Sequence, residues 1–126
     1  MPHEQFVDCI RACEECALAC EHCASACLRE PKMQEMAECI RLDRDCADLC
    51  RMAALLMSRG SRFAARFCEL CAMACDACAE ECDKHDRDHC KACAEACRRC
   101  AAECRRMAAA STNGPTKGRA QAAARS

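Results

Sequence analysis

Cysteines recur at alternating steps of three and four residues along three separate stretches of the chain. These stretches are CEECALACEHCASAC at 13–27, CELCAMACDACAEEC at 68–82 and CKACAEACRRCAAEC at 90–104. Steps that alternate between three and four place side chains on one face of an α-helix, at the inward positions of a packed seam. The repeat therefore predicts helices whose thiols line the inside of a helical bundle, where other proteins place leucine and isoleucine.

Helix-breaking residues divide the chain into four helical segments. Pro31 separates the first segment from the second, Gly60 separates the second from the third, and the polar stretch DKHDRDH at 83–89 forms the third turn. We predict helices at roughly 4–29, 32–58, 61–84 and 87–109. Short connections make neighbouring helices antiparallel, so the expected fold class is all-α: an up-down-up-down four-helix bundle with a cysteine-lined core. The bundle domain is expected to span 1–110, followed by a flexible C-terminal tail at 111–126.

The composition excludes several classes of partner. Lys and Arg number 19 against 20 Asp and Glu, and Trp and Tyr are absent, so we expect no nucleic-acid partner. No apolar run is long enough to cross a membrane, so no membrane partner is expected. The start MPHEQFVDC has neither the basic region nor the apolar region of a secretory signal. We therefore expect a cytoplasmic protein whose thiols stay reduced.

Nineteen cysteines in 126 residues require a chemical role beyond packing. Cysteines four residues apart on a helix have Cβ atoms about 5–6 Å apart, too far for a disulfide, which needs about 3.5–4.5 Å. Two such sulfurs can instead flank one soft ion, and thiolates select Cu(I). Eight pairs have this spacing, while Cys39, Cys68 and Cys90 remain as bridging or cross-helix ligands. The expected metal ligands are Cys9, Cys13, Cys16, Cys20, Cys23, Cys27, Cys39, Cys46, Cys50, Cys68, Cys71, Cys75, Cys78, Cys82, Cys90, Cys93, Cys97, Cys100 and Cys104.

Charge favours clusters in which copper ions share thiolates. Two thiolates on one Cu(I) leave a net negative charge, which is costly when repeated in a core of low dielectric constant. Sharing brings the ratio toward one ion per sulfur and the charge toward zero. We expect multiple Cu(I) ions per chain, between about nine and about nineteen, with release of the thiol protons.

Two other functions compete with copper binding. Cys-x-x-Cys steps also form half of a structural zinc site, so a zinc- or cadmium-binding thiolate scaffold is the main alternative. A thiol-disulfide enzyme or redox sensor needs one or two exposed cysteines of low pKa, whereas nearly all thiols here are expected to face inward. We therefore predict that the protein is not an enzyme and has no catalytic residues.

One end of the seam carries other residue types that can bind metal ions. The inward pattern continues beyond Cys82 to His85 and, before Cys39, to Met36, and antiparallel helices bring these positions to the same end. Met33 and His89 lie nearby, and Asp43 occupies a seam position toward that end. We predict that His85, Met36, Asp43, His89 and Met33 help copper pass from solvent to the thiols.

The repeated CxxCxxxCxxCxxxC on three long segments, with a sparser second segment, resembles the bacterial copper storage proteins over residues 4–109. Without an export signal, the chain is similar to their cytosolic class. The resemblance implies a four-helix bundle that binds many Cu(I) ions on inward thiolates, with metal admitted at one end near His and Met. It also implies a homotetramer that stores and buffers copper and protects against its toxicity, with a copper chaperone as a candidate partner.

Overall fold

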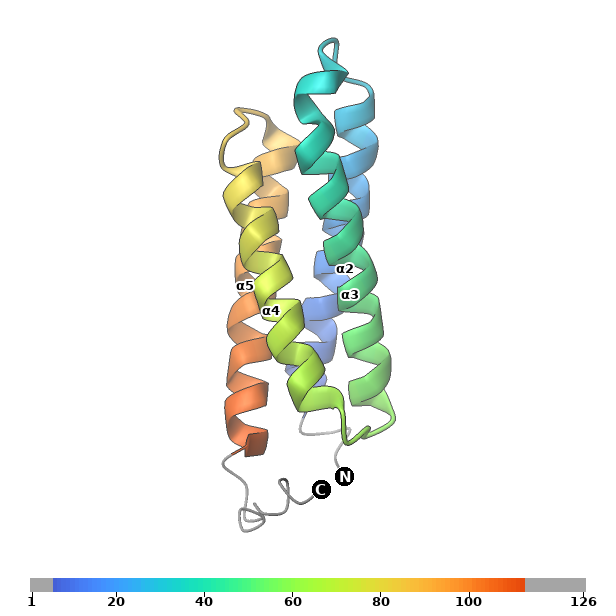
Figure 1. Ribbon diagram of the computed structural model, residues 1–126, viewed down its shortest axis with the longest axis vertical. Coiled ribbons are helices and arrows are strands. Elements are labelled where there is room, and N and C mark those ends of the chain that lie inside the picture. Colours follow the sequence, from blue (N-terminus) through green and yellow to red (C-terminus); the bar gives the residue numbers. More distant parts are fainter. Residues whose placement is uncertain (1–5, 113–126) are drawn as a thin grey trace.

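The computed structural model describes residues 6–112, which form four long α-helices and one short 3-10 helix (Figure 1). These elements are α2 Val7–Leu28, η1 Met33–Met36, α3 Ala37–Ser58, α4 Ala64–Cys82 and α5 Asp88–Thr112. Neighbours in sequence run antiparallel, and each α-helix packs against two others: α2 and α4 both contact α3 and α5. The predicted all-α, four-helix bundle is confirmed.

Two of the connections between helices lie at one end of the bundle, and one lies at the other end. The α2–α3 and α4–α5 connections share an end, while the α3–α4 turn lies at the opposite end (Figure 1). Gly60 ends α3 with a φ of 64°, a left-handed conformation that glycine adopts without steric cost. Its N–H donates to the Met57 carbonyl and the Ser61 N–H donates to the Leu56 carbonyl, which is the Schellman pattern of a helix end. The predicted break at Gly60 is confirmed.

The predicted and observed helix bounds differ by a few residues, most of all at the start of the second helix. The helix α3 begins at Ala37, not near residue 32, because Pro31 lies in a turn and Lys32 has a ψ of 60°, outside the helical region. The 3-10 helix η1 fills the interval. At the other end of the chain, α5 continues to Thr112, past the predicted domain boundary at 110. The remainder of the predicted tail, 113–126, lies outside the described residues.

Buried alanines accompany the cysteines in the core. An alanine follows a cysteine directly at seven buried positions: Ala17, Ala24, Ala47, Ala72, Ala79, Ala94 and Ala101. Consecutive residues on a helix point about 100° apart, so each of these alanines lies beside the thiol seam. A small side chain there lets two helices approach closely. Cysteine thus fills the centre of the bundle and alanine occupies its flanks.

Charged residues cover much of the outside of the bundle. Arg44 and Arg51 of α3 both pair with Glu21 of α2, while Arg98 and Arg105 of α5 pair with carboxylates of the α4 segment. Exposed pairs of this kind contribute little stability individually, about 0–1 kcal/mol. No helix within residues 6–112 combines the length and the apolar character needed to span a bilayer.

Candidate metal centre

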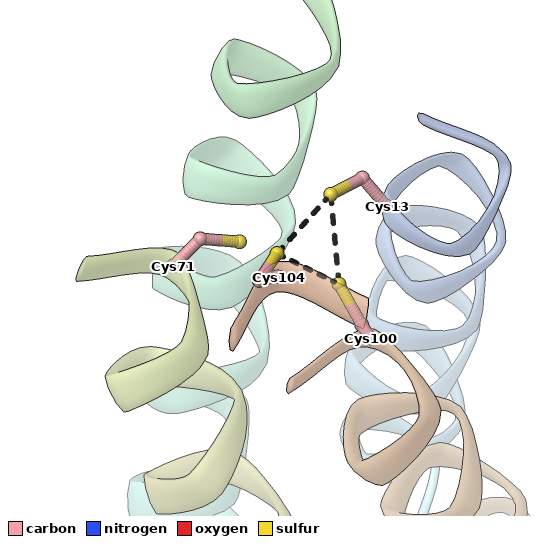
Figure 2. Close-up of side chains that lie close together, drawn as sticks. All are labelled: Cys13, Cys71, Cys100 and Cys104. Carbon is pink, nitrogen blue, oxygen red and sulfur yellow. Dashed lines mark hydrogen bonds between the residues drawn. The ribbon is translucent and has the colours of Figure 1, made fainter. Parts of the chain in front are cut away.

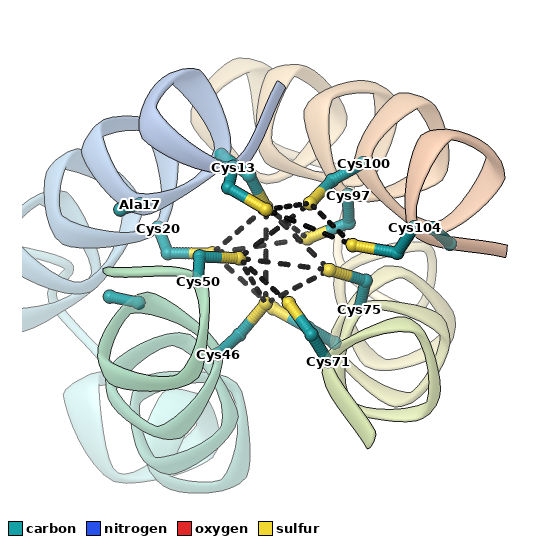
Figure 3. Close-up of a cluster of buried hydrophobic side chains, with 14 of the residues drawn as sticks. Cys13, Ala17, Cys20, Cys46, Cys50, Cys71, Cys75, Cys97, Cys100 and Cys104 are labelled. Carbon is teal, nitrogen blue, oxygen red and sulfur yellow. Dashed lines mark hydrogen bonds between the residues drawn. The ribbon is translucent and has the colours of Figure 1, made fainter. Parts of the chain in front are cut away.

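The thiols of all nineteen cysteines lie buried along the bundle axis, and this column of thiols is called the channel below. Each is a free thiol and none is more than 3% exposed. Viewed along the axis, sulfur atoms from all four helices converge on a common centre (Figure 3). The inward orientation predicted from the three-and-four repeat is therefore confirmed.

The shortest sulfur–sulfur distances join different helices. Cys46 and Cys75 are 3.6 Å apart between α3 and α4, and Cys13 and Cys100 are 3.6 Å apart between α2 and α5. Within one helix, the predicted pairs are slightly wider: 4.0 Å for Cys16 and Cys20, and 3.9 Å for Cys46 and Cys50. These distances are far longer than a disulfide bond of about 2.05 Å. A metal ion in this channel therefore meets thiols from several helices at similar distances.

The thiols form groups of four that share members. Cys13, Cys71, Cys100 and Cys104 have sulfur atoms within 4.8 Å of one another and come from α2, α4 and α5 (Figure 2). Further groups of this kind are Cys16–Cys46–Cys50–Cys75, Cys16–Cys20–Cys46–Cys97, Cys20–Cys78–Cys93–Cys97 and Cys23–Cys27–Cys39–Cys90. Three of these groups overlap: Cys16 and Cys46 belong to two of them, and Cys20 and Cys97 link the second of these to a third. Shared ligands favour clusters of ions with bridging thiolates over a row of separate sites.

Burial favours the protonated form of Cys27 and Cys90, at the end of the bundle that carries the α2–α3 and α4–α5 turns. Burial is the main cause that raises the pKa of Cys90 to about 12, and the neighbouring Cys39 raises it further. Burial likewise raises the pKa of Cys27, followed by its neighbours Cys39 and Cys90. Because thiolates are the metal ligands, each ion that binds here must displace protons.

Asp43 lies inside the thiol channel. Its side chain is fully buried, and its Oδ1 accepts hydrogen bonds from the thiols of Cys78 at 3.2 Å and Cys93 at 3.3 Å. The thiols of Cys39 and Cys82 lie 3.9 Å from its carboxyl oxygens. Burial, and then the charges of the surrounding cysteines, raise the pKa of Asp43 to about 11. It is therefore a neutral acid at neutral pH, placed where copper can arrive only after entering the channel.

Two histidines lie at the end of the bundle formed by the α2–α3 and α4–α5 turns. The Nδ1 atom of His89 is 3.6 Å from the sulfurs of Cys23 and Cys90 and 3.9 Å from that of Cys27. His85 instead hydrogen-bonds to Glu81 through Nε2. Among residues 6–110, whose side chains are described, no thiol forms a hydrogen bond with His85. The helix α4 ends at Cys82, so the seam does not continue to His85 as the spacing suggested.

The two methionines predicted at this end differ in exposure. Met36 is packed in the core at 4% exposure, whereas Met33 is 42% exposed. Glu30, which the sequence did not single out, contacts the Nε2 atom of His89 at 2.9 Å. The two residues are 59 positions apart, and no local pattern links them.

The fold and its core define a class of protein: a four-helix bundle whose core is filled with free thiols. The family model described as Csp, copper storage protein, matches residues 2–109. The chain therefore belongs to the copper storage protein family.

Solved structures and a curated relative agree with this assignment. Cu(I)-bound BsCsp3, a Bacillus copper storage protein, is 50% identical with a TM-score of 0.79, over 82% of this chain and 97% of that one. A cytosolic copper storage protein from Streptomyces lividans, solved with five coppers, is 40% identical with a TM-score of 0.82, over 86% and 95% of the two chains. The cysteine-rich protein YhjQ of Bacillus subtilis is 51% identical over 69 residues. That match spans 54% of this chain and 64% of YhjQ, just under two thirds of its length.

Proposed function

We propose that this protein stores and buffers Cu(I) in the cytoplasm on its nineteen thiolates, without catalytic turnover. The overlapping groups of buried, free thiols carry this proposal, because shared thiolates let many cuprous ions be held with little net charge. The Cu(I)-bound and copper-loaded relatives support the choice of metal. Sequestered copper is kept from reacting elsewhere in the cell, so storage also protects against copper toxicity.

Copper reaches the thiols at the end of the bundle that carries His89, Met33, Met36 and His85. His89 faces three thiols directly and is the first donor we assign to this route. Exposed Met33 offers a soft thioether to the incoming ion. Asp43 acts further inside, where its carboxyl group contacts thiols from three helices.

Zinc remains the main chemical competitor, because four thiols within 4.8 Å of one another also suit a tetrahedral ion. The copper-bound relatives give this zinc and cadmium alternative no support. Sharing of thiols also disfavours it, since each closed zinc site uses four thiolates and adjacent groups here compete for the same ones. We further propose, on the family resemblance, that the protein assembles as a homotetramer and receives copper from a chaperone.

The test is a titration of reduced protein with Cu(I) against a calibrated chelator, with native mass spectrometry of the loaded species. We expect between about nine and about nineteen ions per chain, bound more tightly than Zn(II) under the same reducing conditions. Saturation after one or two equivalents would contradict storage. Displacement of bound Cu(I) by stoichiometric Zn(II) would favour the zinc alternative.

A further inference from the structure

His85 and His89 lie at the channel mouth, the end of the bundle formed by the α2–α3 and α4–α5 turns. They are held in matching ways but face different surroundings. His89 Nε2 lies 2.9 Å from a Glu30 carboxylate oxygen, and His85 Nε2 lies 2.9 Å from a Glu81 carboxylate oxygen. Their side chains are similarly buried, at 15% and 16% exposure. Each glutamate also pairs with one cation, Arg87 beside Glu30 and Lys84 beside Glu81. The difference is that His89 turns its second ring nitrogen toward three thiols.

The carboxylate of Glu30 determines which nitrogen of His89 can face those thiols as an acceptor. Glu30 pairs with Arg87, and a glutamate beside a cation is ionised at neutral pH. An ionised carboxylate only accepts hydrogen bonds. The 2.9 Å contact therefore requires His89 to carry its proton on Nε2. In a neutral imidazole the other nitrogen, Nδ1, then has a free lone pair.

That lone pair points into the channel mouth. Nδ1 lies 3.6 Å, 3.6 Å and 3.9 Å from the sulfurs of Cys23, Cys90 and Cys27. If the proton were on Nδ1 instead, an N–H group would face these thiols and the ring could not donate electrons to a cation there. Glu30 follows the end of α2 while His89 belongs to the first turn of α5, so their contact also fixes the ring across two separate elements.

We propose that Glu30 is a positioning residue for copper uptake: it fixes the tautomer and orientation of His89 so that Nδ1 is presented to the first thiols of the channel. This inference rests on the proposed copper storage. Carboxylate partners of ligating histidines act in the same way in other metal sites, where their loss typically costs about 10–100-fold in affinity or activity. Glu30 contacts His89 and does not itself need to touch copper.

The experiment compares Glu30→Leu with Glu81→Leu. The second is a matched change beside His85, which forms no hydrogen bond with a thiol among residues 6–110. Long-range ¹H–¹⁵N NMR of reduced, copper-free protein reports which nitrogen of each imidazole carries the proton. Stopped-flow transfer of the first Cu(I) equivalents from a chelator reports uptake, and titration reports final capacity. Glu30→Gln keeps an acceptor oxygen without the charge, and Arg87→Gln removes the ion pair alone.

We expect wild-type His89 to be protonated on Nε2, and Glu30→Leu to shift part of the population to Nδ1–H. Initial Cu(I) uptake in Glu30→Leu should slow by about tenfold or more while the capacity stays unchanged. Glu81→Leu and Arg87→Gln should retain the wild-type rate, and Glu30→Gln should retain the wild-type tautomer. If Glu30→Leu loses helical signal, the His89 tautomers of the wild type and of Glu30→Gln still test the proposal.

Three results would overturn the proposal: a wild-type His89 protonated on Nδ1, a Glu30→Leu protein with unchanged tautomer and rate, or equal slowing in Glu81→Leu. Loss of multi-ion capacity in the wild type would instead contradict copper storage itself. The NMR measurement needs no copper, so the two failures are distinguishable.

Discussion

At the scale of single residues, Asp43 is the one buried carboxyl group among the side chains described for 6–110. Thiols of Cys39 on α3, Cys78 and Cys82 on α4, and Cys93 on α5 surround it. Its pKa is raised to about 11, chiefly by burial, whereas in an unfolded chain an aspartate ionises near about pH 3.9. Between these limits the folded protein holds one proton that the unfolded chain has released.

Raising the pH should therefore destabilise the copper-free protein. The stabilising effect of the retained proton is complete below about pH 4 and is lost as the pH rises toward about 11. Because of Asp43, the free energy of unfolding of the copper-free protein should fall by about 1.4 kcal/mol for each unit of rising pH between about pH 5 and 8. Asp43→Asn removes the titrating group and should flatten this part of the curve. Urea unfolding of the reduced proteins at several pH values measures the slope.

The control for that experiment is Asp45→Asn, which removes an exposed carboxylate two residues away on the same helix. It makes the same chemical change on the surface of that helix without altering the channel. Parallel pH curves for wild type and Asp43→Asn would mean that Asp43 is already ionised in the fold, against its burial among thiols.

At the scale of the helix, the cysteine–alanine pairs predict how closely neighbours can pack. Ala101 on α5 follows Cys100 and is 2% exposed, while the next residue, Ala102, is exposed. Ala101→Leu inserts a large side chain into a close-packed flank and should reduce the free energy of unfolding by about 1–3 kcal/mol. Ala102→Leu adds the same atoms to the surface and should change it by less than about 0.5 kcal/mol. Chemical unfolding of both copper-free variants measures the difference; equal effects would contradict the assigned packing.

The helices and the inward thiols were predictable from sequence because both follow from a local period. A step of three or four residues places Cys71 and Cys75 on one face of a helix wherever that helix lies. The same rule extended the face from Cys82 to His85, and it failed there because the helix stops at Cys82. The buried alanine after each of seven cysteines was visible in the sequence as a repeated dipeptide, but its packing role needed the neighbouring helix.

The contacts at the channel mouth could not be derived from local spacing. Glu30 and His89 meet only because the α2–α3 and α4–α5 turns share one end of the bundle, and the exact reach of each turn decides which histidine faces the thiols. Similarly, the 3.6 Å approach of Cys46 to Cys75 depends on the relative height of α3 and α4. The cysteine repeat predicts thiols as the ligands, whereas tertiary packing determines which thiols lie close enough to share one ion.

At the scale of the whole molecule, the channel exists before any metal arrives. All nineteen thiols are already buried and converge from four helices, so loading requires deprotonation and small side-chain movements but no new helix. Far-ultraviolet circular dichroism should therefore give nearly the same helical signal for copper-free and Cu(I)-loaded protein. A chain that wraps an ion from an unfolded state would instead gain its structure on loading.

Loading should nevertheless stabilise the fold strongly, because the assembled channel offers thiolate sites that the unfolded chain presents only singly. One site at a free-ion concentration of 100 times its dissociation constant contributes about 2.7 kcal/mol. For a domain of this size, between the small and large classes, about 1 kcal/mol corresponds to a rise in Tm of roughly 4 °C, so a single filled site should raise Tm by about 10 °C. Thermal unfolding at increasing Cu(I) loading, with Ag(I) as a second soft monovalent ion and Mg(II) as a hard-ion control, measures this rise. An unchanged Tm at full loading would mean that copper binds the folded and unfolded chains equally well, which a preformed receptacle does not allow.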